Sequence, residues 1–210
     1  LKSLPDGVQV TTASGNISAR SVIVTVSVGV LAEDIIQFDP PLEADRRAAL
    51  ELITMGDYHH AGLLFRPGAL PVQPDTWLTY RLEPDASGVA RGGGFLCNIS
   101  NTGLTSFESS GSFSRDLQQT GPESAIEHAL ETLVGFFGSA IRKDFIKGHA
   151  TAWRHEPYVL GSYAGSKPNG HNQRKVLRKP HAERVHFAGE ATHASQHCSA
   201  EEVEAHRCAR

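Results

Sequence analysis

The alternation of apolar and polar residues predicts β-structure at the start of the chain. Residues 8–12 alternate, residues 14–16 carry turn-forming side chains, and residues 17–20 begin the return strand of a predicted hairpin. Residues 21–31 follow as a run rich in β-branched side chains, and its first part is almost wholly apolar. This run fits a strand buried on both faces, in a sheet that helices cover.

The central part of the chain carries the pattern of a meander. Residues 58–65, 76–82 and 94–99 are predicted strands, and residues 111–113 are a weaker fourth candidate. Prolines and glycines lie between these segments, where the chain is expected to turn. The centre is therefore predicted to form a sheet of its own, separate from the buried strand at residues 21–31.

Two segments have the composition and spacing of helices. Residues 42–52 are rich in alanine and leucine, which favour the helical state. Residues 122–137 place apolar side chains on one helical face. Pro122 lies in the first turn of this helix, Glu123 lies at its positive end, and Gly138 closes it.

Residues 153–180 are predicted to be a polar loop, and the basic run at residues 174–179 is interpreted as a solvated loop or helix end. The order of the predicted elements gives a mixed α/β fold with two kinds of sheet. One sheet has a buried strand near each end of the chain, and the other is the central meander with its helices.

Composition and charge narrow the class of protein. The chain has 210 residues, 40% of them hydrophobic, and a formal net charge of −3, which is typical of a soluble globular protein and not of a nucleic-acid binder. No apolar run is long enough to cross a bilayer. Cys97, Cys198 and Cys208 form no evident disulfide framework, which favours a reducing compartment. The chain begins at Leu1 and is interpreted as a fragment.

The segment at residues 185–192 has the most informative local chemistry. Residues 185–188 are a predicted short strand, Gly189 allows a sharp turn, and Thr192 can cap a helix that begins after it. The Glu190 carboxylate can accept hydrogen bonds from sugar-like hydroxyls, while free backbone N–H groups at a helix start face anionic oxygens. A plain strand–turn–helix junction explains the same residues equally well.

Three segments together resemble the flavin-containing amine oxidases, the monoamine and polyamine oxidase family. They are residues 22–31, residues 153–163 and residues 186–192, and their order and separations also match. The resemblance covers nearly the whole chain. It implies a segment of a Rossmann-like FAD-binding domain at residues 1–36, a mixed-sheet substrate-binding domain with helices at residues 37–152, and a C-terminal FAD-binding segment at residues 153–210.

The same resemblance implies a set of cofactor-binding residues. Gly189 and Glu190 would lie against the ribityl and pyrophosphate region of FAD, with Thr192 in the same turn. Trp153 would pack beside the isoalloxazine ring, so Trp153 and the Gly189–Glu190 turn are predicted to converge on one flavin. Two residues further along, Ser199 and Ala200, would face the flavin pyrimidine ring from the start of a helix.

Two residues are candidates for contact with the substrate or the reacting atoms. Tyr163 resembles one wall of the aromatic cage that orients the amine, although an aromatic residue in such a fold can equally be core. His60 stands where much of the family has a lysine that holds a water against flavin N5. Because strand side chains alternate, only one of His59 and His60 can face the cofactor. His60 is preferred, and the alternative is that either histidine simply faces solvent.

The sequence also departs from the family pattern. No G-x-G-x-x-G motif follows a strand, so the nucleotide-cradling half of the FAD site is expected upstream, in the same protein. Cys198, Glu202 and Val203 stand where the family has small residues, and Ser199 stands where monoamine oxidases have a second cage aromatic. These departures leave open a non-catalytic remnant or interaction module that lacks the cofactor.

The function implied by the resemblance is oxidation of an amine to an imine. Hydride passes to the flavin, and O2 accepts the electrons to give H2O2. The expected partners are a small-molecule amine and O2, with no nucleic acid and no membrane segment on this chain. A zinc site is a further alternative with little support, because paired metal-binding motifs do not accompany its candidate ligands, which are His193, His197, Cys198, His206 and Cys208.

Overall fold

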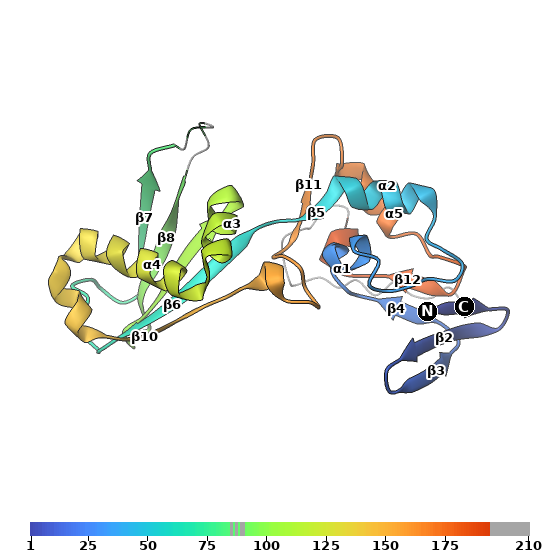
Figure 1. Cartoon of the computed structure of the whole chain (residues 1–210), viewed down its shortest axis with the longest axis horizontal. Helices are drawn as coiled ribbons and strands as arrows, with labels where there is room; N and C mark the ends of the chain where they lie inside the picture. The colour runs from blue at the N-terminus through green and yellow to red at the C-terminus, as the bar shows by residue number, and fades with distance from the viewer. Residues whose placement is uncertain (85, 87, 89–90, 194–210) are drawn as a thin grey trace. The chain divides into compact units, whose positions relative to one another are not determined.

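The computed structural model describes residues 1–84, 86, 88 and 91–193 (Figure 1). The chain forms two compact units: unit 1 combines residues 1–56 with the part of the chain from residue 155 onward, and unit 2 is residues 57–154. The structure divides the chain after residues 56 and 154, whereas the sequence predicted divisions after residues 36 and 152. The first boundary lies later because the helix and strand at residues 44–55 pack within unit 1. The assignment of the units to cofactor and substrate stays a prediction.

Unit 1 begins with a three-stranded antiparallel sheet of β1 (Lys2–Leu4), β2 (Gly7–Thr12) and β3 (Gly15–Ala19). The β2–β3 pair confirms the predicted hairpin, and Gly15 at the turn has a φ of 128° that favours glycine. β4 (Val22–Val24) then pairs in parallel with β12 (Val185–Phe187), which brings the two apolar runs side by side. Both ends of the chain therefore contribute to the same small sheet.

The prediction of a single strand over residues 21–31 was wrong beyond Val24. The Ser27 hydroxyl accepts a hydrogen bond from the Val30 N–H at 3.2 Å and so caps α1 (Val28–Ala32). The same hydroxyl donates to the Val159 carbonyl at 2.6 Å. This cap and its partner override the β-propensity of the valines. Ile23 is 54% exposed, so β4 is also not buried on both faces.

The core of unit 1 lies beneath α2 (Ala44–Leu52), which confirms the first predicted helix. The next strand, β5 (Ile53–Met55), pairs with β11 (Ala164–Ser166), and α5 (Arg174–Leu177) packs against α2. The expected polar loop therefore contains a strand and a helix, with further single turns at η2 (Trp153–His155) and η3 (His171–Gln173). Apolar side chains from both outer segments fill this core, including Val8, Val28, Leu50, Ile53, Leu177, Val185 and Phe187.

A buried arginine on α2 joins this helix to the end of α5. Arg46 is 2% exposed and donates to the carbonyls of Leu177 and Lys179, each at 2.6 Å. Its guanidinium also lies 4.2 Å from the centre of the Phe187 ring. The chain can bury this charge because the Glu43 carboxylate, 3.0 Å from Arg46 Nε, balances it and backbone carbonyls at the end of α5 replace the water that the guanidinium loses.

Unit 2 is built on a five-stranded antiparallel sheet. The strand order is β10 (Phe145–Ala150), β6 (Tyr58–Phe65), β9 (Leu104–Ser110), β8 (Arg91–Ile99) and β7 (Thr76–Leu82). Two helices pack on one face of this sheet, α3 (Gly111–Thr120) and α4 (Pro122–Phe137), and the short η1 (Ser139–Asp144) follows them. The bounds of β6, β7 and α4 confirm the predicted segments, and β8 begins three residues earlier than predicted.

The weak strand expected at residues 111–113 was wrong. Gly111 has a φ of 66° and begins α3, while the strand that the sheet uses is β9, immediately before it. The alternation in β9 is hard to recognise in the sequence, because Thr105 and Ser109 are polar and yet almost fully buried. Polar residues at core positions remove the period-two signal on which strand prediction depends.

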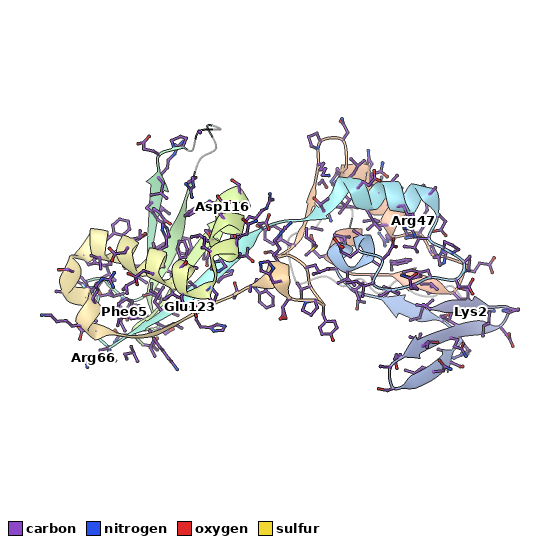
Figure 2. All side chains as sticks on the ribbon, viewed as in Figure 1. Lys2, Arg47, Phe65, Arg66, Asp116 and Glu123 are labelled. Atoms are coloured by element: carbon purple, nitrogen blue, oxygen red, sulfur yellow. The ribbon has the colours of Figure 1, made fainter. Side chains whose placement is uncertain are left out.

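Alternation along β6 separates the core from the opposite face of the sheet. His59, Ala61, Leu63 and Phe65 are buried toward the helices, whereas the residues between them are partly exposed. Figure 2 labels the end of this strand, where Phe65 is buried in the core and the next residue, Arg66, is exposed. The open face of the sheet carries Tyr58 and His60.

A buried carboxylate joins the beginning and end of unit 2. The Asp57 side chain is only 3% exposed and accepts from Arg115 at 2.7 Å and from Arg154 at 2.7 Å. Arg115 lies on α3, and Arg154 is the last residue of the unit. The two guanidinium groups remain partly exposed and stay hydrated. Their positive charges balance the buried negative charge of Asp57.

Across the part of the chain that the structure describes, no helix is both long and apolar enough to pass through a lipid bilayer.

We expect Asp57→Asn to lower the free energy of unfolding of unit 2 by about 1–3 kcal/mol, because both arginines lose a charged acceptor. Both tryptophans of the chain, Trp77 and Trp153, lie in unit 2, so tryptophan fluorescence during urea unfolding reports on it. The matched control is Asp144→Asn, which removes an exposed ion pair to Arg66. It should cost about 0–1 kcal/mol. Equal costs for the two variants would contradict the importance of the Asp57 cluster.

Candidate functional site

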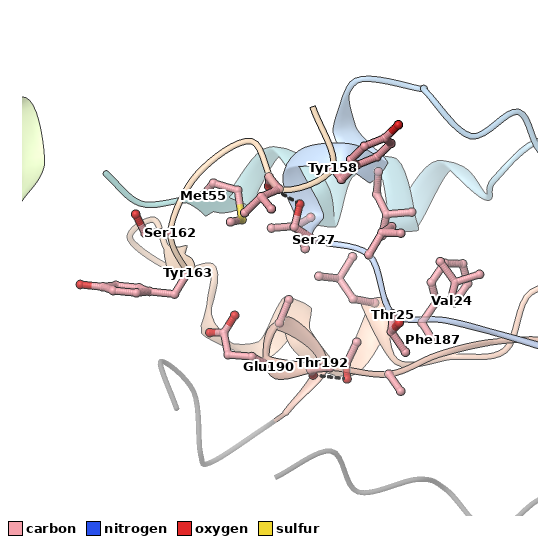
Figure 3. A pocket seen from close by; sticks show the side chains of 18 of the residues that line it. Val24, Thr25, Ser27, Met55, Tyr158, Ser162, Tyr163, Phe187, Glu190 and Thr192 are labelled. Carbon is pink, nitrogen blue, oxygen red and sulfur yellow. Dashed lines mark hydrogen bonds between the residues drawn. The ribbon is translucent and has the colours of Figure 1, made fainter. Parts of the chain in front are cut away.

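A cavity of about 320 Å³ lies in unit 1 at the carboxyl ends of β4 and β12. The backbone from Val24 to Val28 forms one side, and the turn from Phe187 to Thr192 forms the other (Figure 3). Open α/β sheets bind ligands in the crevice beyond the carboxyl ends of their parallel strands. The position of this cavity is therefore that of a ligand site, and most of its lining is apolar.

Gly189 gives the turn its shape. Its φ of 120° and ψ of 177° lie in a region that essentially only glycine adopts. Among the described residues, a Cβ atom placed on Gly189 would meet only the Thr25 carbonyl oxygen, at 3.9 Å, so these residues leave the space beside it open. A ligand can approach the backbone here more closely than it could approach any other residue type. The residues directly after Gly189 form a 3₁₀ turn, η4 (Glu190–Thr192).

The Glu190 carboxylate is held from two directions within unit 1. One oxygen accepts the Ala164 N–H at 3.0 Å, and the other lies 3.8 Å from the Arg174 guanidinium. These contacts tie η4 to the start of β11 and fix the carboxylate at the cavity wall (Figure 3). The Thr192 hydroxyl donates back to the Gly189 carbonyl at 2.8 Å. The helix expected after Thr192 lies outside the described residues.

Arg174 supports this turn and was missed by the sequence analysis. The interpretation of residues 174–179 as solvated was wrong for Arg174, whose side chain is 0% exposed. Its guanidinium donates to the carbonyls of Ala164 at 2.7 Å, Ala191 at 3.1 Å and Glu190 at 3.3 Å. A basic run alone gives no signal for this role, because the carbonyl partners, 10 to 17 residues away, are brought to Arg174 only by the fold.

Tyr163 lies at the edge of the cavity and is 39% exposed. Its carbonyl accepts the Gly56 N–H at 2.7 Å, and the preceding residue, Ser162, donates its N–H to the Gly56 carbonyl at 3.0 Å. These reciprocal backbone bonds fix the position of the tyrosine. The lining also includes Tyr158, which is 86% exposed and was not singled out from the sequence.

Trp153 and His60 belong to unit 2. Trp153 lies in η2 and is 41% exposed, so it is not a core residue of that unit. His60 lies on the open face of the sheet, and its backbone N–H donates to the Thr151 hydroxyl at 3.1 Å. The convergence of Trp153 and Gly189 on one flavin stays a prediction.

His59 points the other way, as the alternation required. It is 1% exposed, and burial lowers its pKa below the usual value of 6.5. The neighbouring His60 lowers the pKa further, and a backbone hydrogen bond at Thr151 opposes the shift. The imidazole is therefore held in its neutral form inside the core, which suits a structural residue.

The remaining candidates from the sequence are the C-terminal residues, the potential zinc ligands and the cysteines. Ser199 and Ala200 lie outside the described residues, as do most of the potential zinc ligands. Within residues 1–84, 86, 88 and 91–193, no group of three or more metal-binding side chains comes together. Burial raises the pKa of the Cys97 thiol to about 11, against a hydrogen bond with Thr105 that lowers it, so this cysteine is no candidate nucleophile.

The sequence profile of the family described as "Flavin containing amine oxidoreductase" matches residues 1–203. The chain is 30% identical over 198 residues to "Lysine-specific histone demethylase 1 homolog 1" of Oryza sativa subsp. japonica, an alignment that covers 89% of this chain and 22% of that protein. It is 26% identical over 194 residues to "Lysine-specific histone demethylase 1 homolog 2" of Arabidopsis thaliana, covering 89% and 25%.

Solved structures share the fold. Cyclohexylamine oxidase from Brevibacterium oxydans IH-35A matches with a TM-score of 0.63 at 20% identity, over 91% of this chain and 41% of that one. Wild-type putrescine oxidase bound to putrescine matches with a TM-score of 0.65 at 16% identity, over 92% and 42%. The chain thus spans about two fifths of these structures and a quarter or less of the curated relatives.

We expect Gly189→Ala to lower the stability of unit 1 by about 1–3 kcal/mol, because alanine is strained at this backbone conformation. Hydrogen–deuterium exchange at β4 and β12 measures the loss directly. Gly165→Ala is the matched control, since Gly165 lies in the same unit at an ordinary φ, and its added Cβ would meet only the Thr54 oxygen at 3.8 Å. Stability there should be unchanged or higher by up to about 1 kcal/mol. The same protection in both variants would contradict the strain argument.

The buried His59 predicts a loss of stability in acid. Because its pKa is lowered in the folded chain, the unfolded chain binds a proton first as the pH falls below 6.5. The stabilisation is therefore complete above pH 6.5 and is lost as the pH decreases through the lowered value. We expect the free energy of unfolding of His59→Leu to depend less steeply on pH below pH 6.5 than that of the wild type. Urea unfolding at a series of pH values measures this dependence. An unchanged slope would show that another group is responsible.

Proposed function

Since the chain belongs to the flavin containing amine oxidoreductase family, we propose that it is the C-terminal part of an FAD-dependent amine oxidase. The observation that carries the proposal is the cavity at the carboxyl ends of β4 and β12, with the open turn at Gly189. The chain contributes one side of the cofactor site in unit 1. In unit 2 it contributes a sheet and helices for the part of the protein that receives the substrate.

The residues of the cavity fit part of an FAD molecule. Gly189 leaves open space next to the backbone, and the Glu190 carboxylate at the cavity wall can accept from cofactor hydroxyls. The apolar lining suits an extended, largely uncharged portion of a ligand. No G-x-G-x-x-G motif occurs in the sequence, so we assign the pyrophosphate-binding loop to a segment upstream of this chain.

When bound, the flavin would accept the hydride from the carbon that bears the amine, and O2 would then take the electrons to give H2O2. The residues of this chain would orient the reactants and exclude water. Tyr163 would present its ring to the amine, and Trp153 would pack beside the flavin ring. Such apolar walls favour the neutral, reactive form of an amine over its protonated form. His60 would hold a water beside the flavin, where the family has a lysine.

The substrate class is an amine, and the relatives support no narrower choice. Two similar proteins are named as histone demethylase homologues and two as oxidases of cyclohexylamine and putrescine.

The direct test joins the chain to its natural upstream sequence and examines the purified protein. We expect a yellow protein whose released cofactor chromatographs as FAD, and whose flavin absorbance bleaches when an amine is added without oxygen. Admitting oxygen should restore the absorbance and produce H2O2. A colourless protein would refute the oxidase proposal and favour a non-catalytic remnant.

A pair of glycine variants tests where the cofactor binds. In the joined protein, Gly189→Val places a branched side chain in the open space beside the turn and should reduce FAD binding by at least about tenfold, roughly 1.4 kcal/mol. Gly165→Ala should bind FAD as the wild type does. Equal retention of FAD by both variants would place the cofactor elsewhere.

A further inference from the structure

Three polar side chains gather on the open face of the unit 2 sheet. Tyr58 and His60 lie two residues apart on β6, so both point to the same side. Glu108 lies on β9 directly opposite His60 in the strand register. All three are partly exposed, and none belongs to the cavity of unit 1.

The contacts among these three side chains run from Tyr58 through Glu108 to His60. The Tyr58 hydroxyl donates to one oxygen of the Glu108 carboxylate. The other oxygen lies 3.8 Å from His60 Nδ1, and the Tyr58 ring meets the imidazole edge-on with their centres 4.8 Å apart. On the opposite side, Thr151 of the β10 end accepts the His60 N–H at 3.1 Å and donates to the His60 carbonyl at 3.2 Å. Thr151 therefore holds both backbone polar groups of His60.

We infer that Glu108 is a positioning residue that fixes the tautomer of His60, with the proton on Nδ1 and the lone pair on Nε2. A neutral imidazole carries one N–H and one lone pair. With the proton on Nε2, the Nδ1 lone pair would face a carboxylate oxygen, and two centres of negative charge would repel. With the proton on Nδ1, an N–H dipole faces the carboxylate and the interaction is attractive.

The consequence for chemistry rests on the proposed function. If His60 holds a water beside the flavin, the atom available to accept from that water is Nε2, because Nδ1 is occupied in facing Glu108. Carboxylates orient imidazoles in this way in metal sites and catalytic triads. Among the described residues, the other charged or titratable groups on this face are Lys147 and His149 of β10, which pair with Leu64 and Gly62 further along β6, and Arg81 of β7 at the far edge of the sheet. Glu108 is the carboxylate opposite His60.

Long-range proton–nitrogen NMR correlations of the imidazole distinguish the two tautomers, and the experiment needs neither flavin nor substrate. The spectra are recorded on the whole chain above the pH range in which histidine changes charge. Loss of one signal set in His60→Gln assigns the residue. We expect the Nδ1–H form to predominate in the wild type.

Two variants test the cause. In Glu108→Gln, the amide oxygen takes the Tyr58 hydroxyl and the amide N–H group faces Nδ1, so the ratio of Nδ1–H to Nε2–H should fall by at least roughly fivefold, about 1 kcal/mol. Tyr58→Phe removes one hydrogen bond, keeps the carboxylate and should preserve the wild-type tautomer. A merely structural role of Glu108 would leave the tautomer of a folded variant unchanged, and backbone amide spectra identify the variants that fold.

A predominance of Nε2–H in the wild type, or an unchanged ratio in Glu108→Gln, would overturn the inference. A colourless joined protein would refute the proposed oxidase and leave the measured tautomer as it is. The two failures are therefore distinguishable.

Discussion

The buried carboxylate of Asp57 is the constraint on which the arrangement of unit 2 depends. It lies at the first residue of the unit and is balanced by Arg154 at the last residue and by Arg115 on α3. A carboxylate with so little solvent contact is stable only while charged donors surround it. Trp153 adjoins Arg154 in the chain, and His60 lies three residues after Asp57, so the geometry of both predicted functional residues starts from this cluster.

Unit 1 also contains buried charges, but they are positive. Arg46 and Arg174 are buried, and backbone carbonyls rather than carboxylates take most of their hydrogen bonds. The planar guanidinium presents five N–H donors in a fixed geometry, whereas the lysine ammonium has three on a flexible stem. Arg174 in this way joins the ends of β11 and η4 and fixes the turn beside the cavity. The cavity keeps its shape because buried arginines hold the backbone that forms it.

The sequence predicted those parts of the molecule in which one local signal dominates. The helix at residues 122–137 has an amphipathic face, a proline at its start and a glycine at its end, and its bounds agree with the structure. β6 was predicted from alternation that continues over eight residues. β9 was missed because buried threonine and serine interrupt the apolar pattern. Residues 25–31 were misassigned because the β-branched run concealed the local Ser27 cap, whose hydroxyl also donates to Val159, a partner far along the chain.

The same distinction separates the site residues that the sequence predicted from those that it missed. Gly189 and Glu190 were found because a glycine–acid pair after an apolar strand is a local signal, and both line the cavity. Arg174, Ala164 and Glu108 were not found, since each acts through a partner that only the fold brings near. The order of the neighbours of His60 on the sheet likewise required the strand register, which sequence alone does not give.

The discontinuity of unit 1 has a consequence for biosynthesis. Unit 2 is a single run of the chain, from residue 57 to residue 154, so its sheet and helices can close as soon as that run has left the ribosome. β4 has to wait for β12, which is made near the end of the described chain, before its ladder can form. Until then the valines of the N-terminal segment stay without their partner strand and are open to unwanted association. An early-folding insert that holds its two ends together at Asp57 and Arg154 shortens the search by which the late strand finds the early one.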